Sequence, residues 1–126
     1  MTIESRLQRG RELQDTMRPG MAEHVQNRFS GPSADFGNYA TEFLFGEIWQ
    51  RPGLDLRSKE IAVLAALIAG KHTHDLRLHM TIATNLGLSR AEIIEIIYQV
   101  ALYVGLPAAG DAMALVEEVL GNEEEE

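Results

Sequence analysis

The chain has 126 residues, a length that suits one small domain with a compact core. It has no cysteine, which excludes a disulfide framework, a thiol nucleophile, thiolate zinc sites and a CxxC redox couple. Its net charge is −8 without a clustered basic stripe, so a nucleic-acid partner is not expected.

The N-terminal part of the chain is predicted to form three helices. Residues 2–18 space their apolar side chains as a helix does and end at a Pro-Gly pair. A second, short helix is expected over residues 21–29, followed by a loop at residues 30–33. A third helix begins near Ala34, repeats apolar residues at the helical period, and is broken by an Arg-Pro-Gly triplet.

The fourth and fifth helices are expected to form the centre of the fold. Asp55 is the predicted N-cap of the fourth helix. Its segment at residues 61–69 is apolar on every side, which predicts a central buried helix. The fifth helix is expected to run from about residue 73 to residue 86 and to stop at Gly87.

Two more helices complete the predicted all-α fold, a compact domain of about six to seven helices. Ser89 and Glu92 form a capping box before the sixth helix, and Pro107 suits the first turn of the seventh. We expect one domain over residues 1–121 and a disordered acidic tail at residues 122–126. The sequence shows neither a membrane span nor the apolar core of a signal peptide, which predicts a cytoplasmic protein with no membrane partner.

The segment GKHTHDLRLHM, residues 70–80, holds three of the four histidines. On a helix, His72, Asp75 and His79 share one face. The segment is open to three interpretations: a solvated helix start with incidental histidines, a metal site made of these three residues, or an acid/base pair of Asp75 and His79. No HExxH or CxxC pattern supports a metal site, which is the least favoured of the three.

A second polar segment, GEIWQRPGLDLR, surrounds a Pro-Gly turn. Glu47, Arg51 and Arg57 place charges around this turn, and Trp49 lies beside them. The segment is either a surface turn anchored by the tryptophan or an anion clamp, because a guanidinium can hold a carboxylate through two parallel hydrogen bonds.

Two further residues, Glu60 and Tyr103, are each open to two interpretations. Glu60 precedes the apolar run of the fourth helix, where it either turns inward with a raised pKa or is the last exposed residue before the core. Tyr103 either lines a pocket or packs against other side chains without a role in binding.

Three stretches, GEIWQRPGLDLRSK, DLRLHM and ALYVGLPAA, together resemble the γ-carboxymuconolactone decarboxylases of bacterial aromatic catabolism. The likeness extends in weaker form from about Arg9 to Val119. It implies the all-helical fold of the alkylhydroperoxidase D-like superfamily and a homotrimer or homohexamer. In the redox branch of that superfamily a glutamate precedes a CxxC and a histidine follows it, and the corresponding positions here look like Glu60, His72, Asp75 and His79.

The resemblance implies cofactor-free, metal-independent loss of CO₂ from a small anionic lactone. His79 is then the expected proton donor, oriented by Asp75, with Glu60 as a further catalytic residue. The residues expected to bind substrate are Arg51, His72, Glu47, Trp49 and Tyr103. A glutamate-rich stretch usually precedes LRLH in the family, and His72-Thr73-His74-Asp75 replaces it here, which points to a changed substrate or acid/base arrangement. A related isomerase or lactone hydrolase and a non-catalytic oligomeric binding protein are the alternatives.

Overall fold

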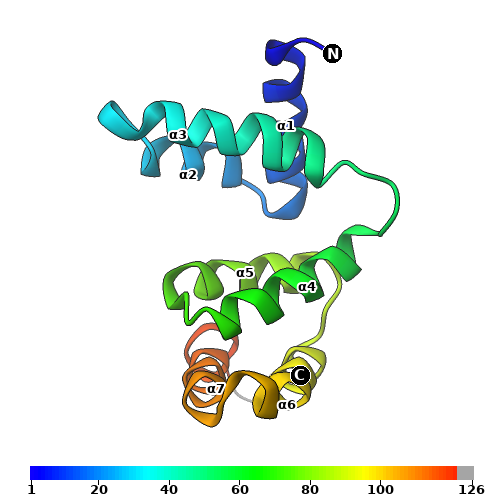
Figure 1. Ribbon diagram of the computed structural model, residues 1–126, viewed down its shortest axis with the longest axis vertical. Coiled ribbons are helices and arrows are strands. Elements are labelled where there is room, and N and C mark those ends of the chain that lie inside the picture. Colours follow the sequence, from blue (N-terminus) through cyan, green and yellow to red (C-terminus); the bar gives the residue numbers. More distant parts are fainter. Residues whose placement is uncertain (122–126) are drawn as a thin grey trace. The chain divides into compact units, whose positions relative to one another are not determined.

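The computed structural model describes residues 1–121, which form two compact units, Met1–Leu54 and a second unit that begins at Asp55. The predicted acidic tail, residues 122–126, lies outside the described residues. Most of the described residues are helical and no strand occurs among them, which confirms the all-α prediction (Figure 1). Within the same residues, no helix is long and apolar enough to cross a membrane.

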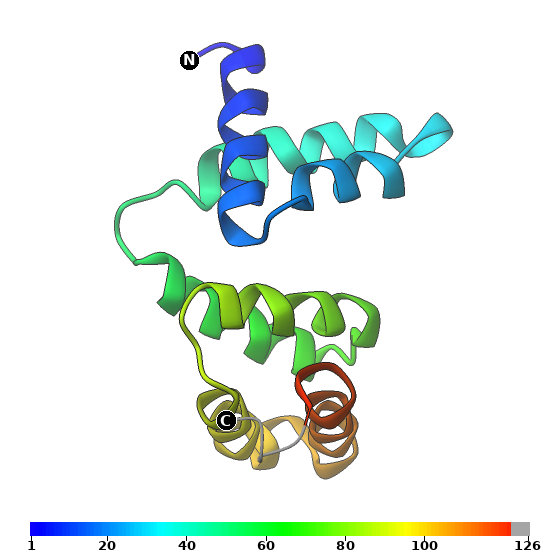
Figure 2. The ribbon, with the colours of Figure 1, turned by 180° about the vertical axis from the view of Figure 1, so that it is seen from behind.

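The first unit is built around a long helix that crosses a second, continuous helical segment. Figures 1 and 2 show α2 beside α3, and α3 running directly into η2, which α1 crosses. The elements are α1 (Ile3–Met17), α2 (Met21–Arg28), the 3₁₀ turn η1 (Gly31–Ser33), α3 (Ala34–Tyr39) and the π-helix η2 (Ala40–Ile48). The three predicted helices are therefore present, and the third changes from α to π winding partway along.

The crossing of α1 and η2 depends on two glycines. A Cβ atom added at Gly10 would lie 2.0 Å from the carbonyl oxygen of Thr41, and one at Gly46 would lie 2.4 Å from that of Arg6. Beside this contact, the buried Gln14 donates a hydrogen bond from Nε2 to Oγ1 of Thr41 at 3.1 Å. Only glycine allows the two backbones to approach so closely, and the hydrogen bond fixes their register.

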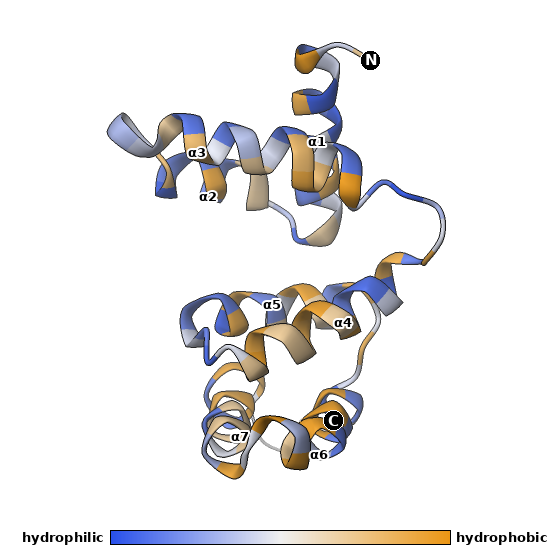
Figure 3. Cartoon of the chain, viewed as in Figure 1, coloured by the Kyte–Doolittle hydropathy of each residue, from blue (hydrophilic) through white to orange (hydrophobic). Residues whose placement is uncertain are grey.

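The second unit is a four-helix arrangement that encloses its own core. Figures 1 and 2 show α4 and α5 side by side, next to the pair formed by α6 and α7. Figure 3 shows that α4, α6 and α7 are largely apolar, whereas α5 begins with polar residues. The helices are α4 (Leu56–Ala69), α5 (Thr73–Asn85), α6 (Arg90–Val104) and α7 (Leu106–Leu120). The most buried core side chains include Leu64, Ile68, Leu76, Met80, Ile93, Ile97 and Val116.

The prediction that α4 is buried on every side is wrong. Its fully buried positions are Glu60, Leu64 and Ile68, one stripe at a spacing of four residues, while Ala62 and Ala66 are exposed. Alanine counts as apolar in the sequence pattern but has so little side chain that its exposure costs little. The helix therefore contributes one face to the core, and that face begins with a carboxylate.

The predicted helix starts differ in how they are capped. Asp55 occupies the N-cap position of α4 without a side-chain capping bond. A hydrogen bond from the Ser58 side chain is instead the main cause that lowers the pKa of Asp55. The capping box before α6 is confirmed, because Ser89 and Glu92 exchange two hydrogen bonds of 3.0 Å. Glu92 also pairs with Arg57, which ties the start of α6 to the start of α4.

Candidate active site

The candidate site in the second unit is a histidine–carboxylate pair that joins two helices. Nδ1 of His79, on α5, lies 2.7 Å from Oε1 and 3.0 Å from Oε2 of Glu60, on α4. The side chain of Glu60 is fully buried, and that of His79 is 13% exposed. The imidazole therefore extends from a buried carboxylate towards the surface of the fold.

The helix sequences explain why this pair forms. Glu60 is the first member of the buried stripe of α4, followed by Leu64 and Ile68. On α5, His79 precedes Met80, a core residue with no exposed surface. Packing of the two apolar stripes against each other brings Glu60 and His79 together at one edge of the core.

Burial and hydrogen bonding act on Glu60 in opposite directions. Burial raises the pKa of its carboxyl above the ordinary value, and the hydrogen bond and charge of His79 partly offset that rise. A buried carboxylate is costly unless it is paired, and here a ring N–H of His79 is the partner. With Nδ1–H donating to Glu60, the other ring nitrogen, Nε2, is the position that gains or releases a proton. This arrangement suits general acid–base catalysis.

The structure gives Glu60, rather than Asp75, as the hydrogen-bond partner of His79. Asp75 lies in the first turn of the same helix and is partly buried, and its orienting role stays a prediction. Glu60 was predicted as a catalytic residue, and of its two alternatives the inward-turned carboxylate with a raised pKa is confirmed.

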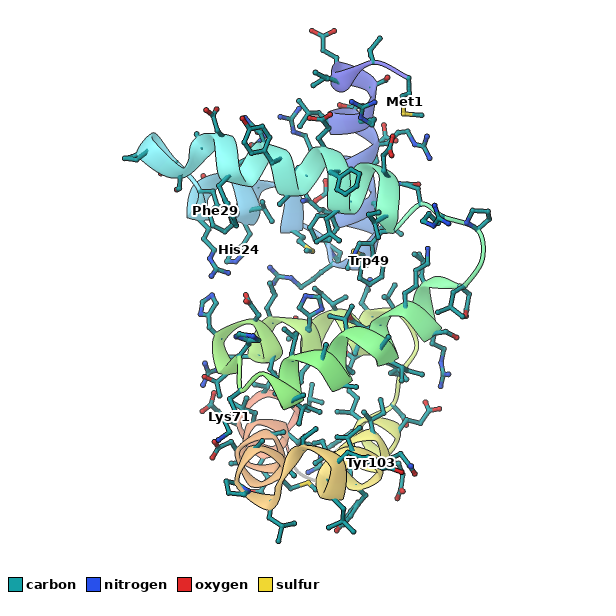
Figure 4. All side chains as sticks on the ribbon, in the orientation of Figure 1. Met1, His24, Phe29, Trp49, Lys71 and Tyr103 are labelled. Atoms are coloured by element: carbon teal, nitrogen blue, oxygen red, sulfur yellow. The ribbon has the colours of Figure 1, made fainter. Side chains whose placement is uncertain are left out.

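The histidines at the start of α5 are placed differently from the prediction. His72 is the N-cap residue, with non-helical dihedral angles, and its ring lies so close to Gly70 that a Cβ there would be 2.5 Å from Nε2. The expectation that His72 shares the helical face of His79 is therefore wrong. His74 is exposed. Lys71, labelled in Figure 4, belongs to the same turn between α4 and α5.

The other proposed substrate-binding residues are spread over both units. In the first unit, Glu47 lies 3.8 Å from Nη1 of Arg6, and Arg51 is exposed beyond the end of η2. Trp49 is buried at the end of η2, with its ring stacked 6.3 Å from that of Phe45 (Figure 4). In the second unit, Tyr103 on α6 is 85% exposed. Substrate binding by Arg51, His72, Glu47, Trp49 and Tyr103 stays a prediction.

The part of the chain that the structure describes contains no set of side chains that could bind a metal ion. Within residues 1–121, no three histidine, aspartate or glutamate side chains gather closely enough to hold a metal ion. Metal independence itself stays a prediction that needs an activity measurement.

Comparison with known proteins identifies a family whose model covers both residues of this pair. A model of the carboxymuconolactone decarboxylase family matches residues 34–118, which include both Glu60 and His79. A 4-carboxymuconolactone decarboxylase of Acinetobacter baylyi is 39% identical over 85 residues, which make up 68% of this chain and 63% of that protein. This chain thus spans less than two thirds of the length of that relative.

Two further relatives cover more of the chain. A nitrosuccinic acid decarboxylase of Metarhizium robertsii is 34% identical over 107 residues, which are 80% of this chain and 73% of that protein. An uncharacterized 15.0 kDa protein of Paracoccus denitrificans is 26% identical over 122 residues, 95% of this chain and 91% of that protein.

Proposed function

Because the chain belongs to the carboxymuconolactone decarboxylase family, we propose that it removes CO₂, without a cofactor, from a small acid of the γ-carboxymuconolactone kind. The observation that carries the proposal is the hydrogen bond between His79 and the fully buried Glu60. An imidazole hydrogen-bonded to a buried carboxylate favours an enzyme over a binding protein, since a binding surface has no need of such an acid–base pair.

The reaction needs no external electron sink. The bond between the γ-carbon and the departing carboxylate breaks, and its electron pair delocalises through the ring alkene to the lactone carbonyl oxygen. The products of this step are CO₂ and a dienolate, which then takes one proton at carbon to give the enol-lactone. Because the substrate holds the electrons itself, the protein has to supply orientation, stabilisation of the oxyanion and the proton.

His79 is the proposed proton donor. Its Nδ1–H is held by Glu60, so Nε2–H is the bond that breaks when the dienolate takes its proton. The charge on Glu60 stabilises the imidazolium before transfer, and solvent returns the proton afterwards. Glu60 is thus a positioning residue, and Asp75 is proposed as a second carboxylate that supports the acid.

Nitro acids are a second candidate substrate class, because the Metarhizium relative is a nitrosuccinic acid decarboxylase. When the carboxylate and the nitro group are attached to the same carbon, loss of CO₂ leaves a nitronate. The nitronate is then protonated at that carbon. Both reactions therefore need a proton donor and no cofactor. The changed residues before LRLH, His72-Thr73-His74-Asp75, are where a difference in substrate is expected.

The proposal is tested by incubating the purified protein, treated with a chelator, with γ-carboxymuconolactone and, separately, with nitrosuccinate. Release of CO₂ together with the enol-lactone or 3-nitropropanoate supports a decarboxylase and identifies the class. A ring-opened product without CO₂ would show a lactone hydrolase instead, and a rearranged lactone an isomerase. Binding of both acids without turnover would show a binding protein.

Replacement of Arg51 by lysine is expected to raise KM or lower kcat/KM by about 10- to 100-fold, with a smaller effect on kcat. Lysine keeps the charge but loses the paired hydrogen bonds of the guanidinium. We expect Arg51 to hold the carbonyl or a carboxylate that stays, because a tight grip on the departing carboxylate would stabilise the ground state. Steady-state kinetics measure the effect, and Arg77→Lys, at an exposed ion pair with Glu118, is the matched control. Equal kinetics in both variants would give Arg51 a structural role.

We also propose that the protein assembles into a homotrimer or homohexamer. Large apolar side chains are exposed where α6 gives way to α7, namely Tyr98, Leu102, Tyr103 and Leu106. A groove of about 400 Å³ between α4 and α6 is lined mainly by apolar residues. A second copy that covers these surfaces would remove them from water.

Light scattering is expected to give a mass of three or six times the 14.0 kDa of the chain. Leu102→Glu should lower that mass, because it places a charge on a side chain that is 88% exposed in the single chain. Leu54→Glu, at another exposed leucine, should leave it unchanged. A mass near 14.0 kDa for the unaltered protein would contradict the assembly.

A further inference from the structure

The first unit contains a pocket of its own, formed by residues of α1, α2, α3 and η2. Its volume is about 290 Å³, close to the lower limit of typical small-molecule sites. It is lined by Arg11, Val25, Gln26, Phe29, Ser30, Gly31, Ala34, Gly37, Asn38 and Thr41. Arg11 is the single charged side chain among these residues, so the pocket has one positive pole.

The guanidinium of Arg11 differs from those of its neighbours on α1. Arg6 pairs with Glu42 at 2.6 Å, and Arg9 donates a hydrogen bond to Gln50 at 3.3 Å. None of the ion pairs found within residues 1–121 involves Arg11. A half-buried cation beside a pocket and without an internal counter-ion is suited to an anionic ligand.

A carboxylate close to Arg11 in the sequence is already engaged. Asp15 lies four residues further along α1, at the spacing that favours an ion pair on a helix. Instead, its Oδ1 accepts a hydrogen bond from the backbone N–H of Ala22 at 3.0 Å, which ties α1 to the start of α2. Asp15 therefore bonds to the junction between α1 and α2 and does not pair with Arg11.

The rest of the pocket wall is uncharged and includes an aromatic ring. Phe29, labelled in Figure 4, lies just beyond the end of α2, and its ring is 5.2 Å from that of Phe36. A Cβ atom at Gly37 would lie 2.6 Å from Cβ of Phe29, so α3 approaches this residue as closely as only glycine permits. The side-chain amides of Gln26 and Asn38 supply neutral hydrogen-bonding groups to the same lining. One cation, two amides and an aromatic wall match a carboxylate attached to a compact, flat apolar body.

We propose that this pocket binds a small aromatic carboxylate, with the Arg11 guanidinium paired to the carboxylate and the ring against Phe29. The site uses neither Glu60 nor His79, and it does not depend on the proposed decarboxylase activity. Its ligand is an acid that binds without being transformed.

Isothermal titration of the purified protein with benzoate tests the proposal. Benzoate should bind, and Arg11→Gln should weaken binding by about tenfold or more, the scale of a charged hydrogen bond. Benzamide, which has the same shape without the charge, should bind no better than benzoate binds to Arg11→Gln. Arg77→Gln removes the same charge from an exposed ion pair in the second unit and should leave the affinity unchanged.

His79→Gln distinguishes this pocket from the candidate active site, since it should bind benzoate as the unaltered protein does. Circular dichroism of Arg11→Gln verifies that its helices are intact. No heat of binding at millimolar benzoate would overturn the proposal, as would equal affinity in Arg11→Gln. Loss of benzoate binding in His79→Gln, with binding kept in Arg11→Gln, would place benzoate at the candidate active site. That result would also overturn the proposal.

Discussion

Replacement of His79 by glutamine is expected to lower kcat/KM for decarboxylation by about 10²- to 10⁴-fold, the usual contribution of a general acid. Glutamine can still donate a hydrogen bond to Glu60, so the contact between α4 and α5 can be kept. The amide N–H is too weak an acid to transfer its proton to the dienolate. Release of CO₂ and formation of the protonated product, followed separately, should show which step has become slow.

His74→Gln is the matched control for this variant, because His74 is an exposed histidine on the same helix. It should turn over as the unaltered protein does, and both variants should keep the same helical signal and melting temperature. If His79→Gln is as fast as His74→Gln, His79 is not the acid. Loss of a bound divalent ion from His79→Gln would instead support the metal interpretation.

Replacement of Glu60 by glutamine is expected to lower kcat/KM by about 10- to 100-fold, the energy of a charge-assisted hydrogen bond. The substitution preserves size and shape but removes the negative charge beside Nδ1 of His79. The imidazolium loses its counter-ion and its charge-assisted hydrogen bond. Kinetics across the pH range measure the loss and give the pH–rate profile.

The acidic limb of the same profile tests the raised pKa of Glu60. Burial raises this pKa, so the carboxylate takes up a proton at a higher pH than an exposed glutamate does. As the pH falls through that range, the Nδ1–H of His79 loses its anionic acceptor, and activity should decline. Glu60→Gln has no proton to take up there and should lack this decline.

Asp75→Asn decides which carboxylate supports the acid. If Glu60 is the positioning residue, Asp75→Asn should lose less activity than Glu60→Gln and should keep the acidic limb. If Asp75→Asn shifts the profile and Glu60→Gln does not, the orienting role belongs to Asp75, and the contact of Glu60 with His79 is structural.

The sequence alone determined the helical architecture and the family. Helix ends follow from local signals such as the capping box of Ser89 and Glu92 and the positive φ of Gly87, which involve only neighbouring residues. The motif residues that carry the family resemblance are likewise read directly from the chain. Local backbone preferences and short-range hydrogen bonds need no knowledge of the tertiary structure, so these predictions were accessible.

The π winding in the second half of the third helix could not be predicted from the sequence. Its apolar spacing predicts a helix but does not distinguish α from π winding. In η2 the backbone N–H of Trp49 donates to the carbonyl of Leu44, five residues back, at 2.8 Å. The close crossing of α1 at Gly10 and Gly46 involves a partner helix that is distant in the sequence.

The partner of His79 was also decided by the tertiary structure. Spacing along one helix pointed to Asp75, because residues four apart on a helix are neighbours. Glu60 is 19 residues away on another helix, and it meets His79 because the buried stripes of α4 and α5 pack in one particular register. The sequence did contain a signal, since Glu60 precedes Leu64 and Ile68 at the same spacing of four. That signal shows that Glu60 faces inward, but which side chain it meets depends on how two helices dock, which no single-helix pattern specifies.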